Sequence, residues 1–124
     1  MAAPNIANVA TITGKTTAVA LANTAANTII NNPASSGKVL KVNSLYVANV
    51  DGTNAATITV QYYSAANIGG TSYPIVSTVV VPADATVVVI SKDTQIYLEE
   101  DKSIGATASA ANDLTITASY EEIS

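Results

Sequence analysis

Hydrophobic and polar residues alternate along most of this chain, most regularly between positions 38 and 63. Successive side chains of a β-strand point to opposite faces, so this period of two predicts strands over 38–50 and 57–63, each with one dry face. Asp51-Gly52 separates the two runs and is a strong signal for a hairpin turn. The sequence therefore predicts a central hairpin, and its dry face needs a second sheet because an isolated hairpin is unstable in water.

The alternation also assigns faces within the first of these runs. Its predicted dry face consists of Leu40, Val42, Tyr46, Ala48 and Val50. Its predicted polar face consists of Lys41, Asn43 and Asn49.

Shorter runs on both sides of this hairpin predict further strands at 16–21, 28–31, 74–81, 86–91, 95–98, 103–110 and 114–120. Turn residues separate them at intervals of roughly 8–12 residues, which is typical of a sandwich or a small barrel. No segment predicts a helix longer than one turn. We expect an all-β fold, an antiparallel β-sandwich of the Ig-like or jelly-roll-like kind with an extended N-terminal arm. Residues 1–14 form the predicted arm and residues 15–124 a single β-sandwich domain.

Two apolar segments are candidates for contact with other subunits. The arm carries Ile6, Val9 and Ile12 in an irregular context, which fits either a frayed terminus or a segment that docks on a neighbour. The valine-rich strands around the Pro82–Ala85 turn are apolar on both faces over part of their length, which indicates burial in a sandwich centre or cover by another chain. The candidate interface residues are Ile6, Val9, Ile12, Val79, Val81, Val87 and Val89.

Composition narrows the possible functions. The 124 residues contain no histidine and no cysteine, which removes the usual general base and all thiolate chemistry. Charged residues make up 11% of the chain, against roughly 25% in an average domain, and the net charge is −4. We expect no nucleic-acid partner, because there is no basic footprint, and no membrane segment or signal peptide. A weakly charged surface suits an extracellular or particle-surface protein that avoids strong fields. It equally suits a subunit covered by neighbours, where charges are costly to desolvate.

Candidate chemistry is sparse. Glu99, Glu100 and Asp101 lie in one predicted turn, and Glu121 and Glu122 lie near the end of the chain. Neither group has the facing geometry of a glycosidase or the spacing of a known calcium loop, so solvated turns are the favoured interpretation. We predict no catalytic, cofactor-binding or metal-binding residue and no cofactor, and expect a protein that is not an enzyme. Tyr62-Tyr63 beside the predicted 65–72 loop leaves a sugar-binding platform open as an alternative to ordinary packing.

A series of short motifs follows in order along the chain: SLYVANVDG, VPADAT, ISKD, IYLEE and SYEEI. In this succession, over about residues 6–123, the chain resembles small virion structural proteins of tailed phages, especially those infecting marine cyanobacteria. The resemblance implies a β-sandwich that forms part of the particle, and capsid decoration, neck and fibre proteins all use small β-sandwiches.

From this resemblance, we expect a non-enzymatic capsid decoration or cement subunit located in the virion. Its partners would be the major capsid protein or other virion proteins, and it would form a homo-oligomer. A neck, tail or fibre component is the alternative within this class. A host-surface glycan-binding module is the alternative from another class.

Overall fold

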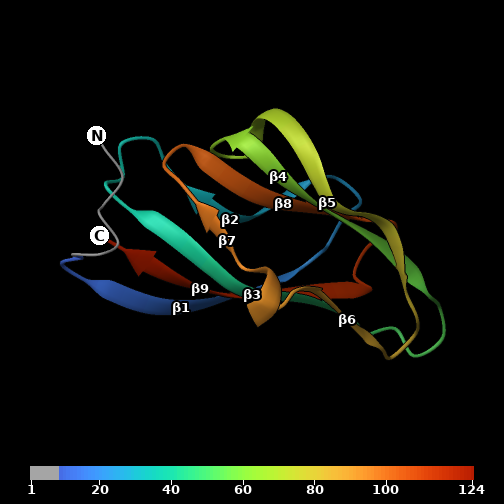
Figure 1. The fold of residues 1–124 in the computed structure, drawn as a ribbon. Helices are drawn as coiled ribbons and strands as arrows, with labels where there is room; N and C mark the ends of the chain where they lie inside the picture. Colours follow the sequence, from blue (N-terminus) through green and yellow to red (C-terminus); the bar gives the residue numbers. More distant parts are fainter. Residues whose placement is uncertain (1–8) are drawn as a thin grey trace.

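The computed structural model describes residues 9–124, and most of this part of the chain is β-strand (Figure 1). The strands are β1 (Ile12–Ala20), β2 (Asn27–Asn32), β3 (Val39–Asn49), β4 (Ala56–Ala65), β5 (Gly69–Val81), β6 (Thr86–Ile90), β7 (Ile96–Leu98), β8 (Lys102–Ala108) and β9 (Leu114–Ile123). Within residues 9–124 the only helical segment is the single 3-10 turn η1 (Lys92–Thr94). The expectation of an all-β chain without a long helix is confirmed for these residues, although β3 and β5 are not short strands, with 11 and 13 residues.

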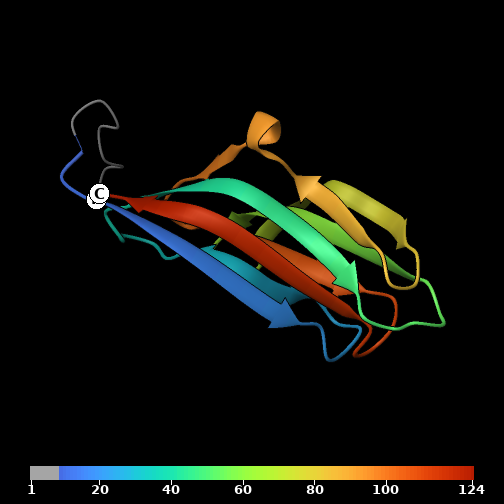
Figure 2. The same ribbon diagram turned by 90° about the horizontal axis from the view of Figure 1, so that it is seen from below.

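The strands form two antiparallel sheets that pack face to face (Figures 1 and 2). Sheet A has the order β1-β9-β3-β6, with β7 paired to β3 beside β6. Sheet B has the order β2-β8-β4-β5. The predicted all-β antiparallel sandwich is therefore confirmed.

Strand pairing is nested from the ends of the chain toward its middle. β1 pairs with β9, β2 with β8, β3 with β6 and β7, and β4 with β5. Such a folded-over ribbon, divided between two sheets, is the arrangement of a jelly roll. Of the two expected kinds of sandwich, the topology is therefore the jelly-roll one.

The predicted central hairpin is wrong, and the valine-rich strands around the Pro82–Ala85 turn do not pair with each other either. β3 and β4 flank Asp51-Gly52 but lie in different sheets, and so do β5 and β6, which flank the Pro82–Ala85 turn. The Asp51 carboxylate accepts the Thr53 N–H at 2.8 Å, closing a local turn within a longer connection that crosses between the sheets. Alternating apolar residues are equally compatible with strands side by side and with strands stacked across a core, so the pattern could not distinguish these two arrangements.

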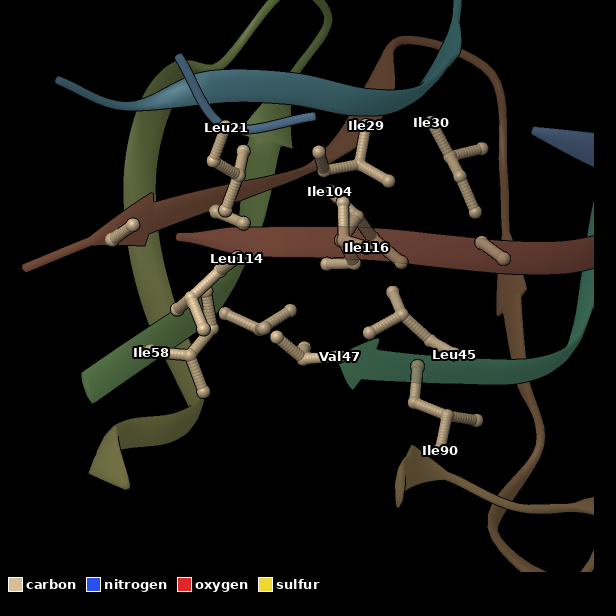
Figure 3. Close-up of a cluster of buried hydrophobic side chains, with 14 of the residues drawn as sticks. Leu21, Ile29, Ile30, Leu45, Val47, Ile58, Ile90, Ile104, Leu114 and Ile116 are labelled. Atoms are coloured by element: carbon tan, nitrogen blue, oxygen red, sulfur yellow. The ribbon is translucent and has the colours of Figure 1, made fainter. Parts of the chain in front are cut away.

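The core lies between the sheets and consists almost entirely of aliphatic side chains (Figure 3). The largest fully buried residues include Leu21, Ile30, Leu45, Ile58, Ile90, Leu98, Ile104, Leu114 and Ile116. β-branched side chains suit this arrangement because their restricted rotamers pack well on a pleated surface.

Among residues 9–124, three polar residues are also buried, and each forms hydrogen bonds to a connection between strands. Asn32 donates to the backbone oxygens of Lys38 and Leu98, both at 3.0 Å. Asn49 donates to the oxygens of Asn54 and Val81, also at 3.0 Å, and so joins the two connections that cross between the sheets after β3 and β5. The third buried polar residue, Ser103, bonds to the β4–β5 turn.

The region of the predicted arm overlaps β1. Ile12 is the first residue of β1 and pairs with Ile123, so positions 12–14 belong to sheet A. Just before the strand, the N–H groups of Ala10 and Thr11 donate to the Ser124 oxygen at 2.7 and 3.0 Å. The candidate residue Ile6 lies outside the described residues.

Candidate interaction surface

The outward side of sheet A carries exposed apolar side chains near its centre. Tyr46 on β3 lies directly opposite Val88 on β6, and the two side chains are 39% and 61% exposed. Thr117 of β9 is the neighbour of Tyr46 on the other side. We call the residues Tyr46, Val88 and Thr117 the outer patch.

A β-bulge in β3 is the reason that Tyr46 points outward. The register between β3 and β9 shifts between Val42 and Ser44, so one residue, Asn43, is inserted into the alternation. Val42 and Leu45 are consequently both buried, and Tyr46 becomes exposed. The predicted faces of β3 are therefore correct up to Val42 and wrong beyond it: Tyr46, Ala48 and Val50 do not lie on the dry face, and Asn49 is buried.

Asn43 also holds a short polar chain across the outward side of sheet A. Its amide nitrogen donates to Glu121 Oε1 at 3.1 Å, and its amide oxygen accepts from Gln95 Nε2 at 3.2 Å. Beyond these hydrogen-bonded side chains, Tyr97 of β7 pairs with Lys41 of β3, and the Tyr97 side chain is 48% exposed. The outer patch thus lies beside a hydrogen-bonded polar border.

The predicted interface valines face the other way. Val81 is fully buried, and Val79, Val87 and Val89 are partly buried against the core. Their outward neighbours Val80 and Val88 are 56% and 61% exposed. Of the predicted arm residues, Val9 is half-buried and Ile12 is 55% exposed. The exposed valines of these two strands are therefore Val80 and Val88, and not the predicted Val79, Val81, Val87 and Val89.

The proposed sugar-binding platform does not form at Tyr62-Tyr63. Tyr63 is buried, and Tyr62 is partly buried at the margin of the core. Burial is the main cause that raises the pKa of Tyr62 above its usual value, with smaller contributions from Glu99 and Tyr73. Tyr73, on the edge strand β5, is the exposed tyrosine of this group, at 56%.

The predicted 65–72 loop is mostly a tight hairpin between β4 and β5. Asn67 and Ile68 both have positive φ, 56° and 51°, and the Gly69 N–H donates to the Ala66 oxygen at 3.2 Å. Positive φ is unfavourable for a β-branched residue, so Ile68 depends on its surroundings to hold this conformation.

Side chains of neighbouring strands hold this turn in place. Ser103 Oγ accepts the Ile68 N–H at 2.9 Å and donates to the Ala65 oxygen at 2.8 Å. Asn31 accepts the Asn67 N–H at 2.7 Å, and Asp101 accepts that of Ala66 at 3.1 Å. We call these contacts the hairpin clamp, and they leave little backbone free to adapt to a ligand.

Several carboxylates make structural contacts, and Glu122 makes the ion pairs of the described residues. Glu122 Oε1 lies 3.3 Å from the ammonium groups of both Lys15 and Lys38. Burial, the largest single influence, would raise the pKa of Glu122, but the hydrogen bonds from the two lysines outweigh it and lower the pKa below its usual value. Among residues 9–124 no group of three or more His, Cys, Asp or Glu side chains could hold a metal ion.

The described residues also show no cavity or cleft. No helix within positions 9–124 is long and apolar enough to cross a membrane. In this part of the chain the features that stand out are therefore open surfaces and strand edges.

Comparisons with known proteins extend the description of the fold. No protein-family model matches the chain. No curated protein sequence matches it either. Among solved structures, a protein from work on Bacillus endospore appendages, described as a family of disulfide-linked pili, is similar over 92% of this chain and 88% of its own, with a TM-score of 0.53 and 17% identity. At this identity the likeness shows a shared fold.

Proposed function

We propose that this protein is a non-enzymatic structural subunit of a tailed-phage particle, and that it acts as a capsid decoration subunit. The outer patch carries the proposal. Tyr46 and Val88 are exposed side by side on a domain whose core is already closed without them. Large apolar groups on a flat surface are typical of contacts between proteins, where tyrosine is enriched.

The surroundings of the outer patch support protein contact over other roles. Ala48 and Ala18 are its neighbours on the outward side of sheet A, and neither is charged. A partner that covers these residues therefore desolvates few charges. A stable contact buries roughly 800 Å² on each partner, so the proposed contact would extend from the outer patch over the rest of the outward side of sheet A.

The fold gives weaker support of a general kind. Jelly rolls occur in viral capsid domains, and also in lectins, so the fold alone does not decide the function. The similar solved protein is described as forming disulfide-linked pili. This chain contains no cysteine, so no disulfide can link it to a neighbour.

Purified particles test the proposed location. The chain should be detected by mass spectrometry in particles purified from the corresponding phage, and antibody label should cover the whole capsid in negative-stain images. Label confined to one vertex would assign the chain to the neck, tail or fibre alternative. Particles without the chain would contradict the proposal.

A matched pair of variants tests the outer patch itself. The double change Tyr46→Ser and Val88→Thr should weaken binding to capsids lacking the chain by about 30-fold, the effect of losing about 2 kcal/mol at a hot spot. The control is Val80→Thr, which removes a similarly exposed valine from sheet B and should leave binding unchanged. Unchanged binding of the double variant would show that the outer patch is not the contact.

A further inference from the structure

The four outer edges of the sandwich differ in how well they are protected against pairing with another strand. Unpaired backbone groups on an edge strand can bind a further strand, and proteins usually prevent this with prolines, bulges, charges or short strands. In β5, Pro74 lies within the strand, two further register shifts interrupt its pairing with β4 nearby, and Thr78 has a φ of 49°. β6 and β7 are short and are separated by η1.

The remaining two edges, β1 and β2, lie on the same side of the sandwich. β2 has six residues, and its pairing with β8 contains an irregularity between Thr28 and Ile30. β1 has nine residues, contains no proline, and pairs with β9 from Ile12 to Ala20 without any register shift. Within residues 9–124, β9 is the only strand that pairs with β1, which lies at the edge of sheet A (Figure 2). Most residues of β1 are exposed. β1 is thus the long, regular edge, without proline or bulge, and its one protecting charge is Lys15.

The register of β1 shows which backbone groups face outward. Thr11 exchanges hydrogen bonds with Ser124 before the strand, and the Leu21 N–H donates to the Leu114 oxygen after it. Antiparallel pairs alternate between bonded and non-bonded positions, so the odd-numbered residues of β1 bond to β9. The N–H and C=O groups of the even-numbered residues point away from β9: Ile12, Gly14, Thr16, Ala18 and Ala20.

We propose that β1 pairs antiparallel with β1 of a second copy of this chain, about a two-fold axis at Thr16. In this register Thr16 faces the partner's Thr16, and Gly14 faces the partner's Ala18. Each of the five residues whose backbone groups point away from β9 then lies opposite such a residue of the partner. Every unpaired N–H and C=O group of the edge therefore forms a hydrogen bond. The two sheets A become one continuous sheet across the dimer.

The charge of Lys15 favours the register centred on Thr16 over the register centred on Lys15. Lys15 is the single charged residue of β1, and its ammonium group is already bound to Glu122 of its own chain at 3.3 Å. With the axis at Thr16, Lys15 faces the partner's Thr17. With the axis one residue earlier, the two Lys15 side chains would face each other directly, which is destabilising. Centring on Thr16 also pairs all nine residues of the strand, the longest overlap that β1 allows.

Single cysteine substitutions in the full chain test this register. The natural sequence has no cysteine, so no other disulfide can form. Thr16→Cys should form a disulfide-linked dimer under mild oxidation, since directly opposed Cα atoms lie about 5.5 Å apart. Ala18→Cys should remain monomeric on non-reducing gels, because the proposed register separates the two thiols by four residues, roughly 13 Å along the strand. Both positions are exposed, so neither change disturbs the core. Equal cross-linking of both variants, or of neither, would overturn the proposal.

A charge exchange provides a second test. Multi-angle light scattering should give twice the chain mass for the natural protein, and the monomer mass for Thr16→Lys and for Thr16→Glu separately. Mixing these two variants should restore the dimer, a result that misfolding cannot produce. The control is Thr86→Lys, which adds the same charge at an exposed position on β6 and should remain dimeric. A natural chain that stays monomeric at all concentrations, or a mixture that does not associate, would overturn the proposal.

This inference is independent of the proposed function. β1 could join two copies in any assembly, and binding to capsids through the outer patch could occur without it. A monomer that still decorates capsids would remove only the proposed dimer.

Discussion

Gly105 is the point in β8 where the outward side of sheet B is most crowded. A Cβ atom placed there would lie 2.7 Å from Ile68 Cγ2, 2.9 Å from Tyr63 Cε1 and 3.0 Å from the Asn27 backbone oxygen. The backbone oxygen cannot move without disturbing the pairing of β2 with β8. The absence of a side chain at Gly105 therefore allows Tyr63 and Ile68 to cover this strand.

We predict that Gly105→Ala lowers the free energy of unfolding by about 1–3 kcal/mol, the usual cost of overpacking. Urea denaturation followed by circular dichroism measures this change. Gly14→Ala is the control, because a Cβ atom there would meet nothing within 4 Å and the free energy should stay the same or rise slightly. Equal effects of the two variants would show that crowding at Gly105 is not important.

Asn49 is a second residue whose exact chemistry matters, because both hydrogens of its amide bind backbone oxygens. Asn49→Asp replaces these donors with a carboxylate directed at two carbonyl oxygens, which should cost about 3 kcal/mol or more at neutral pH. The folded state would raise the pKa of the introduced acid, so the deficit relative to the natural protein should shrink as the pH falls and the acid becomes protonated.

Denaturation of both proteins at neutral pH and in acid measures this difference. The control is Asn23→Asp, since Asn23 is exposed and its side-chain oxygen only accepts hydrogen bonds, from the Ala25 N–H and the Asn27 amide. A carboxylate can replace that oxygen, so a change within about 0.5 kcal/mol is expected. A deficit for Asn49→Asp that does not depend on pH would contradict the explanation.

At the scale of elements, the hairpin clamp decides the order of the β4–β5 turn. Ser103→Ala removes one acceptor and one donor for the turn and leaves the Ile68 N–H and the Ala65 oxygen without their partner. We predict a loss of about 1–3 kcal/mol in the free energy of unfolding. Amide exchange at Ile68 should also accelerate, because its N–H loses its acceptor.

Hydrogen exchange read by NMR distinguishes this local effect from general loosening. Exchange of core amides in β9 should accelerate only by the amount that the loss of global stability dictates. Exchange of the Ile68 amide should accelerate by more than that amount. Ser77→Ala, at an exposed position of β5, is the control and should leave exchange at the turn unchanged. An unchanged Ile68 amide in Ser103→Ala would show that the clamp is not important.

Strand positions could be predicted closely from the sequence, whereas strand partners could not. The predicted strand at 28–31 is β2, one residue longer at each end, and Pro74 was correctly placed in a strand but lies inside β5, where an edge position tolerates it. The nested pairing depends on contacts between segments far apart in the chain, which local alternation does not record.

The outer patch was missed for a more specific reason. Asn43 adds one residue to β3 and reverses every face assignment after it. The signal in the sequence was the polar pair Asn43-Ser44 followed by Leu45, an interruption that strict alternation does not explain. The valines of β5 and β6 were recognised as important, but their burial could not be separated from interface contact by pattern alone.

At the scale of the whole molecule, Glu122 links β9 both to β1 and to the residue that precedes β3. Its two lysine partners, Lys15 and Lys38, lie on β1 and just before β3. Because these contacts lower the pKa of Glu122, its contribution to stability is complete above the ordinary value of 4.5 and is lost as the pH falls below that value. Both lysines are more than 40% exposed, so the contribution is at most about 1 kcal/mol.

We therefore predict that Glu122→Gln is less stable than the natural protein at neutral pH and approaches it in strong acid. Thermal melts across this pH range measure the difference. Glu121→Gln is the control, since its carboxylate accepts from Asn43 rather than from a lysine and an amide oxygen can accept the same bond. A constant difference between Glu122→Gln and the natural protein at every pH would contradict the linkage.

The position of β9 has a consequence for how the protein reaches this state. β9 lies between β1 and β3 in sheet A, so a strand that is synthesised after both of its neighbours occupies the interior of the layer. β1 pairs with a strand about a hundred residues away, and pairing between segments so far apart in the sequence slows folding. β1 therefore has no partner in sheet A until β9 has been synthesised.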